Sequence, residues 1–333
     1  MRGDGFVLPD TKRLPGVFAA LGLMFLAMIG RVAAPFLGEG TAFLAALAGI
    51  KTGKSGLNAL VSFYYYASFM LLPMGIYLYR HRGAGEYIRF KPLSGRHAVY
   101  AVLCGAAGVI FASVISVFWT DFIYALGLKP GQGGFTASSA PELALLILIS
   151  AVAPALCEEL LCRGMLLAAY EDRGTVNAVM ISAAWFACLH ASVEGLPAEF
   201  ISGLVLGLIT VFTGSVFAGI IYHTVHNSVI LILNYTASSA ASAAKEAATE
   251  AAAQTAQSGA SAYPSLIMLG LASGLTLYLL LRRLYRSGGD RALLPPGSKA
   301  KRDVFETVVL VCVLTLGAIF YLLDILDMTV LAS

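Results

Sequence analysis

Polar and ionisable side chains interrupt three of the most apolar stretches of this chain. The first stretch contains two adjacent acids and an arginine, the second a histidine, and the third a histidine and an asparagine. In chain order these residues are Glu158, Glu159, Arg163, His190, His223 and Asn227. A charged group at the centre of a membrane span costs on the order of 2.5–3.5 kcal/mol on insertion scales. Groups retained at that cost are paired, turned towards a cavity, or functional.

The first stretch, ISAVAPALCEELLCRGMLL, places its two acids on different faces of one helix. Glu159 and Arg163 are four residues apart and can pair on one face. Glu158 lies about 100° around the helix, which leaves it to face a cavity. Pro154, one turn earlier, removes a helix hydrogen bond and frees the carbonyl of Ser150. The structural alternative is a buried Glu159–Arg163 pair with Glu158 hydrated at a helix end.

The other two stretches each place a histidine one helical turn from a partner. AWFACLHASVE puts Phe186 and His190 on one face, and GIIYHTVHNSVILIL does the same for His223 and Asn227. A lone histidine in an apolar helix is more often a packing residue than a ligand. We expect His226 to make such a structural contact, a hydrogen bond to another helix.

Helix geometry predicts similar depths for the acid and the two imidazoles. At 1.5 Å per residue, Glu158, His190 and His223 lie roughly 18, 20 and 12 Å from the inner ends of their spans. A carboxylate with a histidine can deprotonate water, and a second histidine with an asparagine offers donors for an oxyanion. This set fits hydrolysis of an amide bond without a covalent enzyme intermediate. One carboxylate and two imidazoles could instead hold zinc, although no HExxH motif occurs.

The elements that must position these residues are membrane helices. Hydrophobic residues make up 58% of the 333-residue chain and charged residues 12%, whereas soluble domains carry about 25% charged residues. This composition excludes a soluble globule, a disordered chain and a nucleic-acid binder. The predicted fold is an all-α, polytopic transmembrane bundle of about eight or nine spans. The candidate spans are 15–37, 57–79, 98–127, 142–168, 176–193, 198–213, 215–235, 263–281 and 304–330.

The spans divide the chain into four predicted regions. Residues 1–141 hold about three N-terminal spans, and 142–235 hold about four spans and all the polar groups above. Residues 236–262 are a low-complexity Ala/Ser-rich stretch, expected to be a linker or a loose surface helix. Residues 263–333 form a C-terminal two-span hairpin. The apolar segment 41–50 is too short to span and is expected to be an interfacial or loop helix.

Charge predicts the orientation of the bundle. The segments 80–96 and 282–303 are rich in arginine and lysine and should be cytoplasmic by the positive-inside rule. With nine spans, the N-terminus is then cytoplasmic and the C-terminus outside, and the site is expected to open towards the cytoplasmic half. An alanine-rich chain with no obvious organelle signal favours a prokaryotic plasma membrane.

Three motifs occur in order, about 30 residues apart: EELLCR, FACLH and HTVHN, which match EExxxR, FxxxH and HxxxN. On these motifs the chain resembles the CPBP family of intramembrane proteases, also called the ABI family. That family includes type II CAAX prenyl endopeptidases and bacteriocin-processing or self-immunity proteins. The resemblance covers about 142–235 and identifies this region as the catalytic core. Between the last two motifs, Gly203 and Gly207 favour close helix packing, and Gly214 and Ser215 favour a tight turn.

The resemblance implies a role for each motif residue. Glu158 and His190 would activate water, His223 and Asn227 would support the oxyanion, and Glu159 and Arg163 would form a supporting pair. The implied substrate is a membrane-associated or lipidated peptide or protein, met in contact with membrane lipid and without nucleic acid. A metal-free mechanism without a cofactor is favoured; the alternative is zinc held by Glu158, His190 and His223.

Two other functions stay open on the sequence. A non-proteolytic membrane partner or bacteriocin-immunity protein would use the polar site to bind a peptide or a neighbouring protein. A proton-coupled transporter would use the intramembrane acids and histidines as a relay. No duplicated half with a matching set of polar residues occurs, which disfavours the transporter.

Overall fold

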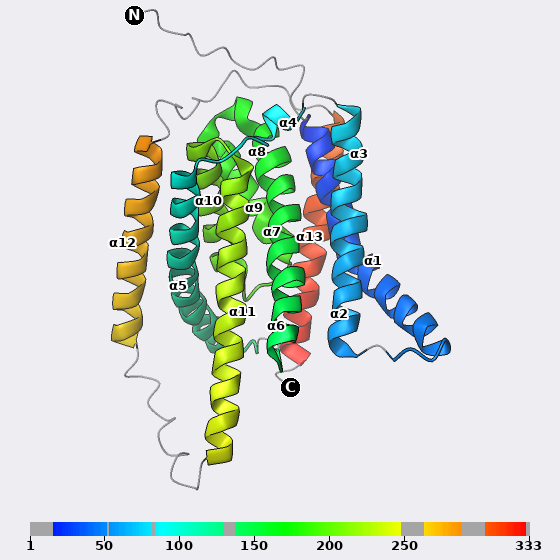
Figure 1. Cartoon of the computed structure of the whole chain (residues 1–333). Coiled ribbons are helices and arrows are strands. Elements are labelled where there is room, and N and C mark those ends of the chain that lie inside the picture. Colours follow the sequence, from blue (N-terminus) through cyan, green and yellow to red (C-terminus); the bar gives the residue numbers. More distant parts are fainter. Residues whose placement is uncertain are drawn as a thin grey trace, which may run out of the picture.

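The structure is a computed structural model that describes residues 16–51, 53–81, 84–129, 137–247, 263–287 and 304–330. Within these ranges every regular element is helical, and the long helices stand side by side as one bundle (Figure 1). The predicted all-α polytopic fold is therefore confirmed.

Seven helices in the described ranges are long and apolar enough to cross a membrane: Val17–Leu47, Gly56–Arg80, Gly95–Ala125, Ala140–Arg173, Leu196–Thr213, Val216–Ser239 and Tyr263–Ser287. The fifth stretch predicted to span forms Thr175–His190, which is apolar but has only 16 residues, whereas a span needs about 20. The ninth stretch forms a 27-residue helix, α13 (Val304–Val330). These helices, together with the apolar sequence, make the chain an integral membrane protein.

The N-terminal third contains a helical hairpin and a long single helix. α1 (Val17–Leu47) is followed by a continuous rod made of α2 (Lys54–Phe63), the π-helical η2 (Tyr64–Leu71) and α3 (Leu72–Arg80). The short α4 (Ala84–Tyr87) precedes α5 (Gly95–Ala125). Residues 41–47, part of the segment predicted to be an interfacial or loop helix, are helical and continue α1.

The rod that carries the two acids alternates between α- and π-helical geometry. Its segments are α6 (Ala140–Ile147), η3 (Leu148–Val152), α7 (Ala153–Glu159), η4 (Leu160–Leu166), α8 (Leu167–Tyr170) and the 3₁₀ turn η5 (Glu171–Arg173). The π-helical segments η3 and η4 flank α7, which ends at Glu158 and Glu159. Such segments are rare and often occur at functional sites.

The histidine-bearing helices pack tightly against one another. α9 (Thr175–His190) lies against α10 (Leu196–Thr213), and a Cβ added to Gly203 would come within 2.9 Å of the Ala183 Cα. Gly214 adopts the left-handed conformation, with φ +65°, and turns the chain into α11 (Val216–Ala247). The predicted close packing and tight turn are thus both present.

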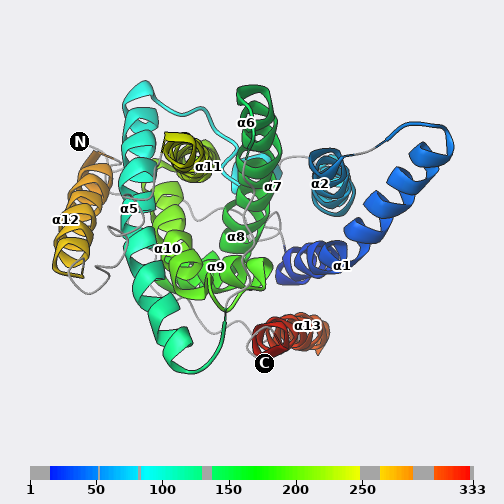
Figure 2. The ribbon, with the colours of Figure 1, turned by 90° about the horizontal axis from the view of Figure 1, so that it is seen from below.

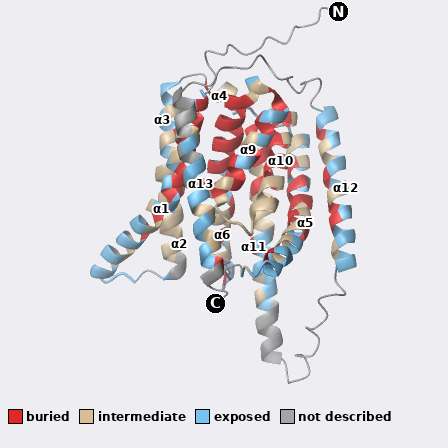
Figure 3. Ribbon diagram, turned by 180° about the vertical axis from the view of Figure 1, so that it is seen from behind, coloured by how far each residue is buried: buried red, intermediate tan, exposed pale blue. Residues whose placement is uncertain are grey.

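Burial places the core around the polar residues. Figure 3 shows buried residues concentrated in α9 and α10, and mostly pale, exposed surface along α12 (Tyr263–Ser287). Residues of α7, including Glu158 and Glu159, are buried as well. Large apolar side chains are exposed along the outer helices, as expected for surface in contact with lipid. α11 runs to Ala247, so the first part of the low-complexity stretch 236–262 is helical; residues 248–262, like 1–15 and 288–303, lie outside the described residues.

Candidate active site

A fully buried ion pair joins the supporting residues that the sequence predicted. Arg163 Nη1 donates to Glu159 Oε1 at 2.8 Å, and neither side chain is exposed. Arg163 Nη2 donates to the carbonyl of Gly203 at 3.0 Å, and the guanidinium lies 4.3 Å from the centre of the Phe186 ring. His223 Nδ1 contacts the same Glu159 oxygen at 3.0 Å. Glu159 therefore links the helices that carry all three motifs.

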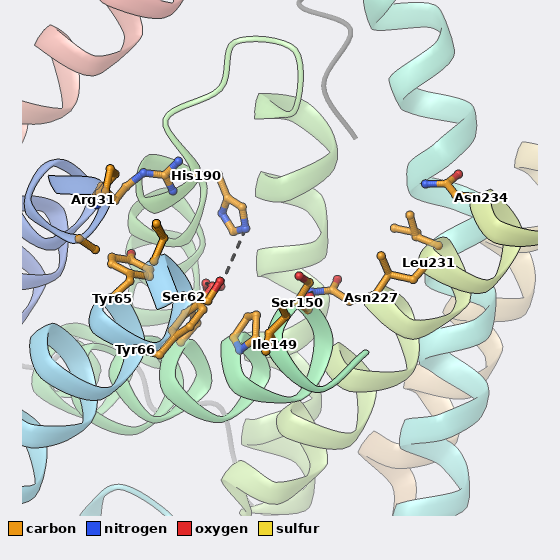
Figure 4. A pocket seen from close by; sticks show the side chains of 16 residues that line it. Arg31, Ser62, Tyr65, Tyr66, Ile149, Ser150, His190, Asn227, Leu231 and Asn234 are labelled. Atoms are coloured by element: carbon orange, nitrogen blue, oxygen red, sulfur yellow. Dashed lines mark hydrogen bonds and ion pairs between the residues drawn. The ribbon is translucent and has the colours of Figure 1, made fainter. Parts of the chain in front are cut away.

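Glu158 faces a different space from Glu159, as their angular separation predicted. Its Oε2 lies 3.9 Å from His190 Nε2 (dashed line in Figure 4), and its Oε1 accepts a hydrogen bond from Tyr66 at 3.3 Å. Both residues line a cavity of about 570 Å³ between α1, η2, α7 and α11. A 3.9 Å separation is too long for a direct hydrogen bond, and Glu158 Oε2 is buried without a hydrogen-bond partner, so this oxygen lacks the contact that a bridging water would supply.

The hydrogen bonding of His190 fixes which ring nitrogen faces the acid. His190 Nδ1 lies 2.9 Å from the carbonyl oxygen of Phe186. A carbonyl oxygen only accepts hydrogen bonds, so Nδ1 carries the proton. In the neutral ring Nε2 is then the basic nitrogen, and it is the one directed at Glu158. This is the orientation that a general base requires.

Asn227 uses the backbone group that Pro154 releases. Its Nδ2 donates to the carbonyl of Ser150 at 3.3 Å, which is the acceptor predicted to be freed by the proline. One N–H of the Asn227 amide then remains for another partner. Asn227 lines the first cavity and also a second one of about 450 Å³ between α5, α10 and α11.

His223 and His226 also line the second cavity, with different surroundings. Because His223 Nδ1 donates to the Glu159 carboxylate, its Nε2 can donate only when the ring is doubly protonated. His226 stacks on Tyr222 with ring centres 5.7 Å apart, and its buried Nδ1 has no hydrogen-bond partner. Nδ1 therefore does not make the interhelical hydrogen bond predicted for His226.

The three residues proposed as zinc ligands are not gathered into a metal site. Across the described residues, no group of three His, Cys, Asp or Glu side chains has a geometry suited to a metal ion. His190 Nε2 faces Glu158, whereas His223 Nδ1 faces Glu159. The two histidines are therefore assigned to different carboxylates.

One comparison with known proteins identifies the central region. Residues 140–229 match the family model described as type II CAAX prenyl endopeptidase Rce1-like. We call residues 140–229 the Rce1-like domain after this similarity. The match covers the predicted catalytic core and confirms the resemblance read from the three motifs. No curated protein and no solved structure matched the chain.

Helices outside the Rce1-like domain hold the end of α9. The last carbonyls of a helix have no partner within it, and here they lie inside the bundle. Arg31 of α1 donates to the carbonyl of Leu189, and Tyr321 of α13 donates to that of Ala187 at 2.9 Å. His190, the last residue of α9, is thus anchored by both terminal regions of the chain.

The loop that follows His190 is anchored in the same way. The backbone N–H of Val193 donates to Asp324 of α13 at 2.7 Å, and its carbonyl accepts from the Trp119 indole of α5 at 2.7 Å. Ala191 adopts the left-handed conformation, with φ +49°, as the chain leaves the helix. We call the four contributing side chains, Arg31, Trp119, Tyr321 and Asp324, the α9 clamp.

The motifs did not reveal the clamp residues. The only sequence signal for them is the free-energy cost of placing a polar side chain in an apolar helix. This cost is greatest for the charged groups of Arg31 and Asp324. Spacing within one helix cannot predict which distant carbonyl such a group will meet.

The first cavity lies on the side of Glu158 that faces away from the basic segment 80–96. Ser215, at the start of α11, donates to the Lys91 carbonyl, and Glu171, at the far end of the rod, pairs with Arg89. These two helix ends therefore adjoin the basic segment.

The lining residues lie farther along both helices from that segment. On α11 they run from Asn227 to Asn234, and on the rod they run from Glu158 back to Ile149. If the basic segments are cytoplasmic, the cavity extends away from the cytoplasm. The predicted orientation and the predicted cytoplasmic opening therefore cannot both hold.

Proposed function

We propose that this chain is an intramembrane endopeptidase that hydrolyses a peptide bond in a membrane-associated or lipidated protein. The Rce1-like domain supports protease activity in a membrane setting. The single observation that carries the mechanism is the 3.9 Å approach of Glu158 Oε2 to His190 Nε2 beside a cavity. Both groups can act on one water molecule there.

In the proposed reaction, a water molecule between these two groups loses a proton to Glu158 or His190 Nε2. The resulting hydroxide attacks the peptide carbonyl carbon, and the carbonyl oxygen becomes an oxyanion. When the C–N bond breaks, the proton held by Glu158 or His190 passes to the leaving amine. The products are a new carboxyl group and a new amino group, and no bond forms between substrate and enzyme.

The oxyanion would be stabilised by Asn227 and His223. Asn227 retains one free N–H after its bond to Ser150, and His223 can donate from Nε2 when the ring is protonated. The Glu159 carboxylate, 3.0 Å from His223 Nδ1, would hold the ring in place for this role. Removal of one such donor in other enzymes slows catalysis by about 10²–10³.

We favour a metal-free reaction, because His223 and His190 face different carboxylates. A chelator should therefore leave the rate unchanged, and elemental analysis of the purified protein should find no stoichiometric metal. Loss of activity on chelation with recovery on adding zinc would overturn this part of the proposal.

For the setting, we propose a prokaryotic plasma membrane with the basic segments in the cytoplasm. In this proposal, membrane lipid is the partner that contacts the outer helices of the bundle. The substrate would reach Glu158 from within the bilayer or from the side opposite the basic segments.

The experiment that tests the function uses purified protein in liposomes with a panel of quenched peptides. The panel would contain one apolar membrane peptide with a prenylated cysteine, the same peptide without the lipid, and a soluble scrambled control. Cleavage of a membrane-bound member at one bond, identified by mass spectrometry, is the expected result. A flux of ions or solutes without cleavage would favour the transporter instead.

A further inference from the structure

His190 lies between two carboxylates, and only one of them belongs to the three motifs. Glu158 Oε2 is 3.9 Å from Nε2 on one side of the ring, and Glu199 Oε2 is 3.8 Å from Nδ1 on the other. Glu199 stands in the first turn of α10 and lines the second cavity together with His190. The motifs assign it no role.

The state of the His190 ring gives the Glu199 charge a specific effect. Nδ1 carries a proton because it bonds to the carbonyl of Phe186. A carboxylate beside that N–H favours the form of the ring that has also gained a proton at Nε2. A base that must accept a proton at Nε2 is therefore strengthened by Glu199.

Glu199 is held in this place at a cost. Its Oε2 is buried and has no hydrogen-bond partner, which destabilises the folded protein. The exposed amides of the first helical turn favour a negative charge here, which offsets part of the cost.

A glycine one turn earlier leaves room for the carboxylate. A Cβ at Gly195 would lie 2.2 Å from Glu199 Oε1, so even an alanine would displace the acid. The backbone of Gly195 is ordinary, with φ −79°, and tolerates alanine without strain. The position of Glu199 can therefore be changed without removing its charge.

We propose that Glu199 is a positioning residue for catalysis, which acts through the charge it places 3.8 Å from His190 Nδ1 and so strengthens His190 as a base. The inference rests on the proposed function, because it assigns Glu199 to the water-activating histidine. The Nδ1 proton is not transferred; it stays between His190, Phe186 and Glu199 while Nε2 gains and loses a proton.

Other charged and titratable groups lie near Glu199 and His190 and also affect the protonation of the His190 ring. They are Arg31 of α1, Glu158 of α7, Cys188 of α9, Tyr222, His223 and His226 of α11, and Tyr321 and Asp324 of α13. α5 contributes the uncharged residues Ala112, Ser113 and Ser116 to the cavity wall. The positive charge of Arg31 opposes the effect of Glu199 on the His190 ring, and Arg31 is present in both the wild type and Glu199→Gln.

The test follows the His190 ring directly and needs no substrate. Protein labelled with ¹⁵N in its five histidine rings would be titrated in detergent by NMR, and His190→Gln would identify the His190 signal. In Glu199→Gln the His190 ring should gain its second proton at a pH about 1 unit lower than in the wild type. Gly195→Ala should shift it in the same direction, and Glu199→Asp should restore most of the wild-type behaviour.

Glu194→Gln is the matched control, because it removes a nearby acid that lines neither cavity. In this variant the His190 ring should titrate as it does in the wild type. In the cleavage assay, the acidic limb of the rate profile should move to lower pH in Glu199→Gln and not in the control. A His190 titration that is the same in Glu199→Gln and the wild type would overturn the proposal, even if the wild-type protein cleaves peptides. The proposed function is tested by a separate result, because it is contradicted if the wild-type protein cleaves none of the peptides.

Discussion

At the scale of single residues, the two adjacent glutamates have separate surroundings because of their 100° separation on a helix. Glu159 is fully buried between Arg163 and His223, whereas Glu158 faces a cavity and His190. One acid can thus hold the helices together while the other remains free to act on water.

Loss of the buried Glu159–Arg163 pair should lower the stability of the protein and not only its rate of catalysis. Arg163→Ala leaves the Glu159 charge buried without its guanidinium, which costs about 3–5 kcal/mol. We expect a markedly lower thermal unfolding midpoint in detergent, measured by fluorescence or light scattering. Arg173→Ala, at the half-exposed end of the same rod, is the control. Equal midpoints for Arg163→Ala and the wild type would contradict the structural role.

Loss of the Asn227 amide should affect catalysis more than binding. Asn227→Ala removes one oxyanion donor, so kcat should fall by about 10²–10³ with a small change in KM. Steady-state kinetics on the cleaved peptide measure both constants. Asn234→Ala, on the same cavity wall one to two turns away, should change kcat little. A change in KM alone for Asn227→Ala would contradict the oxyanion role.

Contacts within one helix could be predicted from the sequence, and contacts between helices could not. The four-residue spacing predicted the Glu159–Arg163 pair, and Pro154 predicted the free carbonyl of Ser150 that Asn227 uses. The His223–Glu159 contact joins residues 64 positions apart. No periodicity encodes such a distance.

At the scale of elements, the end of α9 depends on helices that the motifs do not include. α1, α5 and α13 donate or accept hydrogen bonds at Leu189, Ala187 and Val193. Because α9 is only 16 residues long, its carbonyl end lies within the bundle and needs these partners. This gives the first and last helices a physical role in placing His190.

Asp324, a residue of the α9 clamp that lines neither cavity, should affect the rate through the position of His190. Asp324→Ala removes the acceptor for the Val193 N–H, and a small displacement of His190 can cost about 10²-fold in rate. We expect a clear fall in kcat while the protein stays folded and monodisperse on size-exclusion chromatography. Asp327→Ala, an exposed acid on the same helix, should behave like the wild type. Equal rates for the two variants would count against the clamp.

At the scale of the whole molecule, apolar composition and length were enough to predict a helical membrane bundle, which the structure has (Figure 2 views it along the helices). They were not enough to predict the span count, because a 16-residue apolar helix can be buried inside a bundle without crossing a membrane. Charge predicted the side of the membrane on which the basic segments lie, whereas the cavity is lined by side chains from five separate helical rods.

The direction of the cavity predicts a labelling pattern. Asn234 lies at the end of the cavity far from Glu158, and Arg80 lies at the basic end of α3. Asn234→Cys and Arg80→Cys should therefore react with a membrane-impermeant thiol reagent from opposite sides of sealed vesicles, above the wild-type background. Reaction of both from the same side would contradict the cavity direction described here.

The central claim is that Glu158 activates water in this bundle, and one measurement tests it most directly. It is the rate of peptide cleavage by Glu158→Gln relative to wild type, in liposomes that contain equal amounts of folded protein. Glutamine keeps the size of the side chain but cannot accept a proton, so the rate should fall by about 10²–10⁴ while the unfolding midpoint stays near that of wild type. A Glu158→Gln protein that cleaves at the wild-type rate would contradict the account.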